Sequence, residues 1–192
     1  MAKKDTRRHI IKVAAKLFAR KGYVATSTRE ICKEANVNLS LIAYYFGGKE
    51  GLFKAIVEEC FQPIFAFIEA NKNTQSPIEC LQNYFICIKH YAQDEYFGLF
   101  LAKLISSPFF EFVAQNYSLK VFNFVKGIIE KGITQGIFRE NLHIKYTCIS
   151  LLSMLNFYIV NQKALDQAIE IFDDEDYFAH TFELFLCGIK KS

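Results

Sequence analysis

The stretch "NVNLSLIAYYFGGKEGLF", residues 36–53, combines features that neither a core helix nor a loop would need together. Val37 and Ile42 belong to an apolar helical pattern, whereas the adjacent Tyr44 and Tyr45 carry hydroxyl groups that a core helix does not require. A Gly-Gly-Lys break follows directly. The stretch therefore predicts a short helix with one packed side and one polar side.

Two more helices are predicted upstream. Apolar residues recur at helical spacing over residues 6–21, and Gly22 is expected to end that helix. Thr26 or Ser27 can cap a second helix, with Glu30 completing a capping box. This helix should end near Asn36, a residue type that tolerates the left-handed conformation of a tight turn. Asn38 is expected to cap the third helix, so the three-residue turn has the length of a helix-turn-helix unit.

The charge of the chain is concentrated at its N-terminal end. The first 55 of the 192 residues hold 12 Lys and Arg against 4 Asp and Glu, a balance of +8, whereas the remaining residues have a balance of −5. A basic head on an acidic body indicates a polyanionic partner, most simply nucleic acid. The alternative is a solvated basic face without a partner.

The remaining sequence predicts an all-α protein. Gly and Pro are sparse, 52% of residues are hydrophobic and 16% are aromatic, which favours long helices around a substantial core. We expect a DNA-binding domain over residues 1–48 and a second helical domain over residues 49–192. The further helices are expected at about residues 50–70 with a bend at Pro63, from 77, at 95–105, through an aromatic segment to 132 or 136, at 143–160, and at 176–189, with the polar sequence "DDED" (173–176) in a loop.

Several classes of function find no support in the sequence. There is no nucleophile with a positioned base, no Gly-rich phosphate loop and no cluster of metal ligands, so we expect no enzyme, no cofactor and no metal. No signal peptide or span of about 20 apolar residues is present, which predicts a cytoplasmic protein that does not enter a membrane. The six cysteines are expected to be reduced and buried.

Residues 10–53, "IIKVAAKLFARKGYVATSTREICKEANVNLSLIAYYFGGKEGLF", strongly resemble the DNA-binding domain of TetR-family transcriptional repressors. The matching motifs are Ala14-Ala15-Lys16-Leu17-Phe18-Ala19, Gly22-Tyr23, Thr26-Ser27, Ile31, Ala35-Asn36-Val37, Ala43-Tyr44-Tyr45-Phe46 and Lys49-Glu50-Gly51-Leu52. The match covers about a quarter of the chain; "GITQGIFREN" (132–141) and "ELFLCGI" (183–189) support the second domain only generally. Asn36, Ser40 and Ala43 depart from the family pattern, so no operator sequence can be transferred.

The resemblance implies a DNA operator read by the turn and the third helix. Side chains expected to contact phosphates are Thr26, Ser27, Thr28, Tyr44, Tyr45 and Lys49. Side chains expected to read base edges are Arg29, Asn38, Leu39, Ser40 and Leu41. The alternative for either tyrosine is packing inside the small domain, and the alternative for Leu39 or Leu41 is a place in the core.

The resemblance also implies a homodimer, in which the helices at 143–160 and 176–189 of two chains form a four-helix bundle. Alternatively, these helices form the core of one chain. The unusual density of rings between residues 84 and 124 could surround an unidentified small, apolar or aromatic effector, although each ring can equally be core. The expected effector contacts are Tyr84, Phe97, Phe100, Lys103, Phe110, Tyr117 and Asn156.

Three classes of function are therefore compared. The leading hypothesis is a dimeric repressor that leaves its operator when an effector binds. A DNA-binding regulator without small-molecule input is the second, and a cavity-free second domain would favour it. An all-helical enzyme is the third, against which the absence of catalytic motifs argues.

Overall fold

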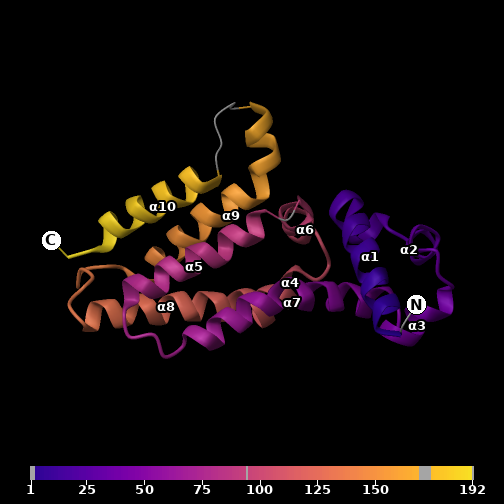
Figure 1. Ribbon diagram of the computed structural model, residues 1–192, viewed down its shortest axis with the longest axis horizontal. Helices are drawn as coiled ribbons and strands as arrows, with labels where there is room; N and C mark the ends of the chain where they lie inside the picture. Colours follow the sequence, from indigo (N-terminus) through magenta and orange to yellow (C-terminus); the bar gives the residue numbers. More distant parts are fainter. Residues whose placement is uncertain (1–2, 94, 169–173, 192) are drawn as a thin grey trace. The chain divides into compact units, whose positions relative to one another are not determined.

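The chain is all-α in the computed structural model, which describes residues 3–93, 95–168 and 174–191 (Figure 1). The helices are α1 (Lys3–Ala25), α2 (Thr28–Ala35), α3 (Leu39–Phe46), α4 (Lys49–Asn71), α5 (Pro77–Ala92), α6 (Glu95–Leu104), α7 (Phe110–Val113), a π-helical turn (Ala114–Ser118), α8 (Leu119–Thr134), α9 (Ile144–Ala168) and α10 (Asp174–Ile189). Among these residues, β-type pairing of the backbone is limited to one isolated antiparallel bridge between Phe138 and Lys190. No helix in the described part of the chain combines the length and apolar character needed to cross a membrane.

The first three helices form a small bundle, with α2 packed on α1 and α3 packed on α2. Figure 1 shows them in indigo and violet, with α2 and α3 following one another beside α1. Their apolar faces meet in a core that includes Ile10, Phe18, Ile31 and Ile42, all at most 1% exposed. The helical spacing of these residues in the sequence is what makes one continuous buried surface.

The turns between these helices have the geometry that the sequence predicts. Ser27 is the N-cap of α2, and its hydroxyl oxygen accepts a hydrogen bond of 3.1 Å from the Glu30 amide. Asn36 ends α2 in the left-handed region, at φ 50° and ψ 51°. Asn38 precedes α3 as expected, but its side chain makes no capping hydrogen bond. These features define a helix-turn-helix whose turn is held by backbone geometry.

The described chain separates into two compact units. The first contains residues 1–63 and 95–113, so it includes the predicted DNA-binding domain, the first part of α4, and α6 and α7. In this unit the ring of Phe109 lies 4.8 Å from the rings of both Tyr23 and Phe53. An aromatic cluster therefore joins the segment at 95–113 to the N-terminal helices.

The second unit contains residues 64–94 and 114–192. In it α5 packs against α8, α9 and α10, and α8 packs against α9. Ser76 caps α5 by accepting a 3.2 Å hydrogen bond from the Glu79 amide, and Pro77 begins the helix at the residue where the sequence predicts its start. The turn after α8 brings Phe138 against Gly132, so closely that a Cβ on Gly132 would lie 1.9 Å from the phenyl ring.

Some predicted details differ from the structure. The aromatic segment before residue 132 is divided into α7, the π-helical turn and α8, and α9 extends eight residues beyond residue 160. Asp174 begins α10, so the last three residues of "DDED" are helical, whereas its first residue lies outside the described residues. Asp94, which by its residue type can cap the helix expected at 95–105, also lies outside them. All six cysteines are free, and Cys32, Cys80 and Cys148 are buried as expected. Cys60 and Cys87 are half-buried and Cys187 is exposed, so the prediction that all are buried is wrong for these three.

Candidate DNA-binding surface

The expected base-reading side chains belong to the helix-turn-helix, with Arg29 in the first turn of α2 and the other four at the turn and the start of α3. Arg29, Asn38, Leu39 and Ser40 are exposed, and Leu41 is half-buried. Leu39 is 52% exposed at the first position of α3, so it is not part of the core. The N-terminal turn of α3 thus presents hydrogen-bonding and apolar groups side by side, which is the combination that base edges in a major groove require.

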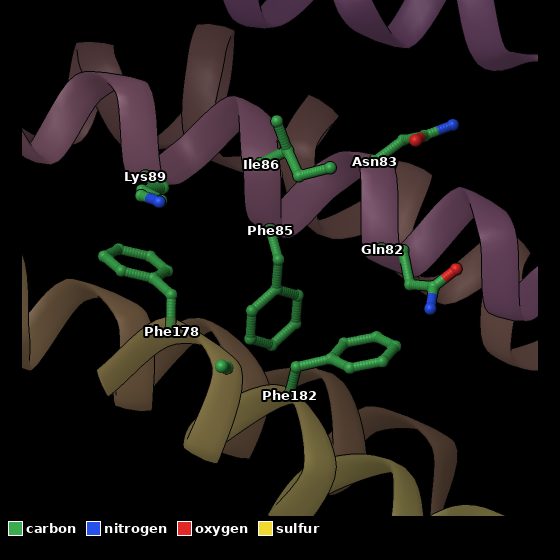
Figure 2. Close-up of a pocket in the computed structure, with 8 residues that line it drawn as sticks. Gln82, Asn83, Phe85, Ile86, Lys89, Phe178 and Phe182 are labelled. Carbon is green, nitrogen blue, oxygen red and sulfur yellow. The ribbon is translucent and has the colours of Figure 1, made fainter. Parts of the chain in front are cut away.

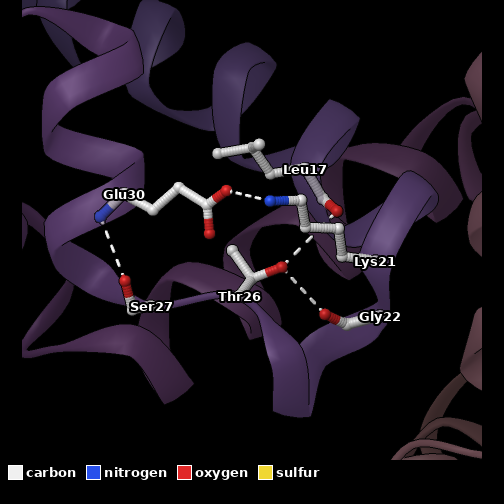
Figure 3. A network of polar contacts seen from close by, with 6 residues as sticks. All are labelled: Leu17, Lys21, Gly22, Thr26, Ser27 and Glu30. Atoms are coloured by element: carbon white, nitrogen blue, oxygen red, sulfur yellow. Dashed lines mark hydrogen bonds and ion pairs between the residues drawn. The ribbon is translucent and has the colours of Figure 1, made fainter.

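Thr26 does not belong to this surface. Its side chain is completely buried, and its hydroxyl donates to the carbonyl oxygen of Gly22 at 2.9 Å, with the Leu17 carbonyl at 3.4 Å (Figure 3). The expectation that this hydroxyl contacts a phosphate is therefore corrected. The hydroxyl satisfies the carbonyl where Gly22, at φ 79°, leaves the helical conformation of α1.

Ser27 and Thr28, the next two residues, remain accessible at the start of α2. Glu30 pairs with Lys21, and Figure 3 shows this carboxylate reaching across to the end of α1. The hydrogen bond from Lys21 lowers the pKa of the Glu30 carboxylate below its ordinary value. The first turn of α2 is thereby tied to α1 while its outer side stays open to a ligand.

The two adjacent tyrosines, Tyr44 and Tyr45, differ in how far their side chains are exposed. Tyr44 is 64% exposed, whereas Tyr45 is half-buried, and their ring centroids lie 5.0 Å apart in an edge-to-face contact. The alternative that Tyr44 packs inside the domain is not what the structure shows. Tyr45 packs partly beside Phe46, with 6.1 Å between the ring centroids.

Lys49 begins α4 after two glycines with positive φ, Gly47 and Gly48. Its Nζ lies 4.2 Å from the centre of the Tyr23 ring, a cation–π contact. Burial lowers the pKa of the Lys49 ammonium below its ordinary value. Tyr23 therefore holds this lysine beside the start of the helix. The sequence alone did not indicate this contact.

The basic side chains of α1 do not all serve one surface. The Nζ of Lys16 lies 4.9 Å from the Tyr96 ring centre, and the Arg20 guanidinium lies 6.0 Å from it. Arg7 sits 5.4 Å above the Phe46 ring and contacts the Glu59 carboxylate at 3.3 Å. Part of the N-terminal positive charge thus binds within the first unit, which the sequence alone did not indicate.

A hollow of about 510 Å³ adjoins the turn between α2 and α3. Its lining residues are Thr6, Cys32, Lys33, Asn36, Val37, Asn38 and Leu41. Thr6 and Lys33 were not predicted for this surface. The position of Lys33 in the last turn of α2 was the available signal, because a basic residue there lies beside the turn.

The seven residues expected to bind an effector are divided between the two units. Phe97 and Phe100 are buried in the first unit, where Lys103 and Phe110 are exposed. The other three belong to the second unit: Tyr84 is 2% exposed, Tyr117 is half-buried with its ring stacked on Phe65, and Asn156 is exposed on α9. Burial raises the pKa of the Tyr84 phenol. Tyr84, Phe97 and Phe100 are buried, and one pocket built from all seven residues stays a prediction.

A groove of about 580 Å³ instead lies between α5 and α10 in the second unit. It is lined by Gln82, Asn83, Phe85, Ile86, Lys89, Phe178, Ala179 and Phe182. Figure 2 shows the Phe85 ring directed from α5 toward α10, between Phe178 and Phe182. None of the seven predicted residues is among the described residues that line this groove.

Residues 10–56 match the family described as "Bacterial regulatory proteins, tetR family". The probable HTH-type transcriptional regulator YttP of Bacillus subtilis (strain 168) is 30% identical over 92% of this chain and 87% of its own length. The chain belongs to the TetR family of bacterial regulatory proteins. It is thus a transcriptional regulator with an N-terminal DNA-binding helix-turn-helix and a C-terminal helical domain.

Two further relatives of this TetR-family regulator cover nearly its whole length. The HTH-type transcriptional repressor NicS of Pseudomonas putida (strain KT2440) is 25% identical over 97% of this chain and 93% of its own length. A solved structure of HlyIIR, a hemolysin II transcriptional regulator, is 26% identical and has a TM-score of 0.71, covering 98% of this chain and 99% of that chain. The similarity therefore extends through both parts of the TetR-family chain.

Proposed function

We propose that this TetR-family regulator is a cytoplasmic repressor. In this proposal it binds a palindromic DNA operator as a homodimer and leaves the operator when a small apolar or aromatic effector binds. The observation that carries the proposal is the exposure of Arg29, in the first turn of α2, and of Asn38, Leu39 and Ser40, at the turn and the start of α3. NicS, a transcriptional repressor that is similar over nearly the whole chain, supports repression over activation.

Base reading is assigned to that exposed set and to Leu41. An arginine can bind the O6 and N7 atoms of guanine, an asparagine or serine can bond to base edges, and a leucine can pack on a thymine methyl group. Phosphate contacts are assigned to the hydroxyls of Ser27, Thr28, Tyr44 and Tyr45. These contacts would set the register of the helix on DNA and carry no sequence information.

Lys49 is the proposed phosphate contact at the start of α4. The free amide groups of a helix N-terminus and the helix dipole both favour an anion there. The contact with Tyr23 at 4.2 Å holds the ammonium beside this N-terminus before DNA arrives. Less side-chain entropy is then lost when the phosphate binds.

The homodimer is proposed to form through α9 and α10. Tyr146, Ile149 and Phe157 follow one side of α9 at helical spacing and are 65%, 52% and 62% exposed. Leu184 on α10 is 55% exposed. Exposed apolar surface of this kind on two neighbouring helices fits the self-complementary interface of a two-fold dimer, while the opposite faces of both helices are core.

Phe157 offers a direct test of that interface. Phe157→Asp should convert the protein from twice the mass of one chain to a single chain in sedimentation equilibrium. The matched control is Ile105→Asp, which changes an equally exposed residue of the first unit (65% exposed) and should leave the dimer intact. A wild-type protein that sediments as a single chain would contradict the proposal.

A second candidate function is DNA binding without small-molecule input. The burial of Tyr84, Phe97 and Phe100 favours it, because rings that fill a core leave no space for an effector. The groove between α5 and α10 favours the effector-controlled repressor, since its volume lies in the range of small-molecule sites.

The DNA-binding proposal is tested by selecting genomic fragments that the purified protein retains. The selected fragment is then titrated by fluorescence anisotropy at increasing salt, beside a scrambled fragment of equal length. Affinity should fall steeply with salt, and Lys49→Ala should make the slope shallower by about one unit. Affinity that is equal for both fragments and independent of salt would overturn the proposal.

A further inference from the structure

The groove between α5 and α10 has the composition of a site for one kind of small molecule. Phe85 and Phe178 form its base and are only 4% and 3% exposed. Phe182 packs edge-to-face on Phe85, with 5.2 Å between the ring centroids. Ile86, which is 66% exposed, forms an accessible apolar rim. These side chains offer an elongated apolar body a surface already fixed by ring packing.

The polar residues are unevenly distributed along this groove. Lys89 carries the single charge among the described lining residues. Figure 2 shows Lys89 beside Phe178 and Gln82 at the other end, beside Phe182. Seven helix positions separate them, a distance of about 10 Å along α5. A positive charge at one end and an amide at the other favour a ligand with one anionic end and an apolar chain between.

We propose that the groove binds a small amphipathic anion, such as a carboxylate on an elongated apolar body. Lys89 contacts the anionic group, and Phe85, Phe178 and Phe182 contact the apolar chain. This inference rests on the proposed control by an effector and adds the site and the charge of that effector. It places the effector in the second unit, in a groove that shares none of the seven predicted contact residues.

Decanoate is a suitable probe, and the chain supplies its own reporter position. The protein has no tryptophan, so Ile86→Trp places a single indole at the accessible rim of the groove. Decanoate added below its micelle concentration should change the indole emission saturably. Decan-1-ol, which lacks the charge, should bind about tenfold more weakly, because it forfeits the charge-assisted hydrogen bond.

Substitutions at Lys89 test the charge. In the Ile86→Trp protein, Lys89→Gln should weaken decanoate binding about tenfold and leave decan-1-ol binding unchanged, whereas Lys89→Arg should retain the decanoate affinity. Lys103→Gln is the matched control, because it removes an exposed lysine that the sequence had indicated as an effector contact. Equal binding of decanoate by the Lys89→Gln and unchanged proteins, or an effect of Lys103→Gln alone, would overturn the assignment.

Two further outcomes are informative. If Ile86→Trp or Lys89→Gln changes the sedimenting mass, a second copy of the chain covers the groove and the small-molecule assignment is overturned. The fluorescence titration uses no DNA, so its failure can be distinguished from failure of the repressor proposal. A protein that binds its selected operator but gives no saturable decanoate signal disproves the groove site alone.

Discussion

The local sequence predicts where side chains lie more closely in residues 26–53 than in the aromatic part of the chain, residues 84–124. In the first region, the cap at Ser27, the left-handed Asn36 and the exposed residues of α3 lie where local pattern predicts them. In the second, rings expected around one pocket are distributed between two units.

The difference arises from the range of the interactions. A helix cap or a left-handed turn is decided by residues three or four positions apart, which a sequence displays directly. A pocket is formed by helices that are far apart in the chain. Phenylalanines recur at the same helical spacing in the sequence whether their rings fill a core or line a cavity. Aromatic density therefore indicates burial and does not identify a binding site.

The largest expected effect concerns Phe100, which this comparison assigns to the core. Its side chain is 3% exposed and its ring lies 5.5 Å from that of Phe53. Phe100→Ala should lower the free energy of unfolding by about 3–5 kcal/mol, measured by urea denaturation, because it leaves a cavity in packed surroundings. Phe110→Ala is the matched control: Phe110 is 51% exposed and should have a much smaller effect. Equal, small losses for both variants would show that Phe100 lines an open pocket.

A second effect tests the close packing within residues 26–53. A Cβ on Gly51 would lie 1.8 Å from the carbonyl oxygen of Phe46, a backbone atom that cannot rotate away. Gly51→Ala should therefore lower the free energy of unfolding by about 1–3 kcal/mol. Gly127→Ala in α8 meets nothing within 4 Å and should raise it by up to about 1 kcal/mol. Thermal unfolding of both variants checks the pair, and a neutral Gly51→Ala would contradict the described junction of α3 and α4.

A smaller effect concerns Thr26, where local pattern and structure disagree. Thr26→Val keeps the shape of the side chain but removes the hydrogen bond to the Gly22 carbonyl. The free energy of unfolding should fall by about 1 kcal/mol, and operator affinity at a temperature where the protein is folded should be unchanged. Anisotropy titrations beside Ser27→Ala check this expectation. If Thr26→Val weakened operator binding in a folded protein, Thr26 would contact a phosphate as the sequence first suggested, and the buried geometry would be contradicted.

Sequence reasoning predicted the all-α class and most helix boundaries because apolar spacing, Ser27, Ser76 and the glycine breaks all act locally. It did not predict the need for Gly51, since the approach of Phe46 depends on the angle between two helices. Nor did it predict the contact of Phe109 with Tyr23, which joins positions far apart in the chain. The groove was missed for the same reason, because α5 and α10 meet only in the folded unit.

The central claim is that the exposed side chains of the turn and α3 read the sequence of an operator. The most direct measurement is selection of bound DNA fragments from a random library, carried out in parallel with the unchanged protein, Asn38→Ala and Tyr44→Phe. Asn38→Ala should relax the preference at particular base positions, with a loss of about 1–3 kcal/mol in discrimination at each, whereas Tyr44→Phe should weaken all sequences alike. Base preferences that Asn38→Ala leaves unchanged and Tyr44→Phe alters would contradict the assignment.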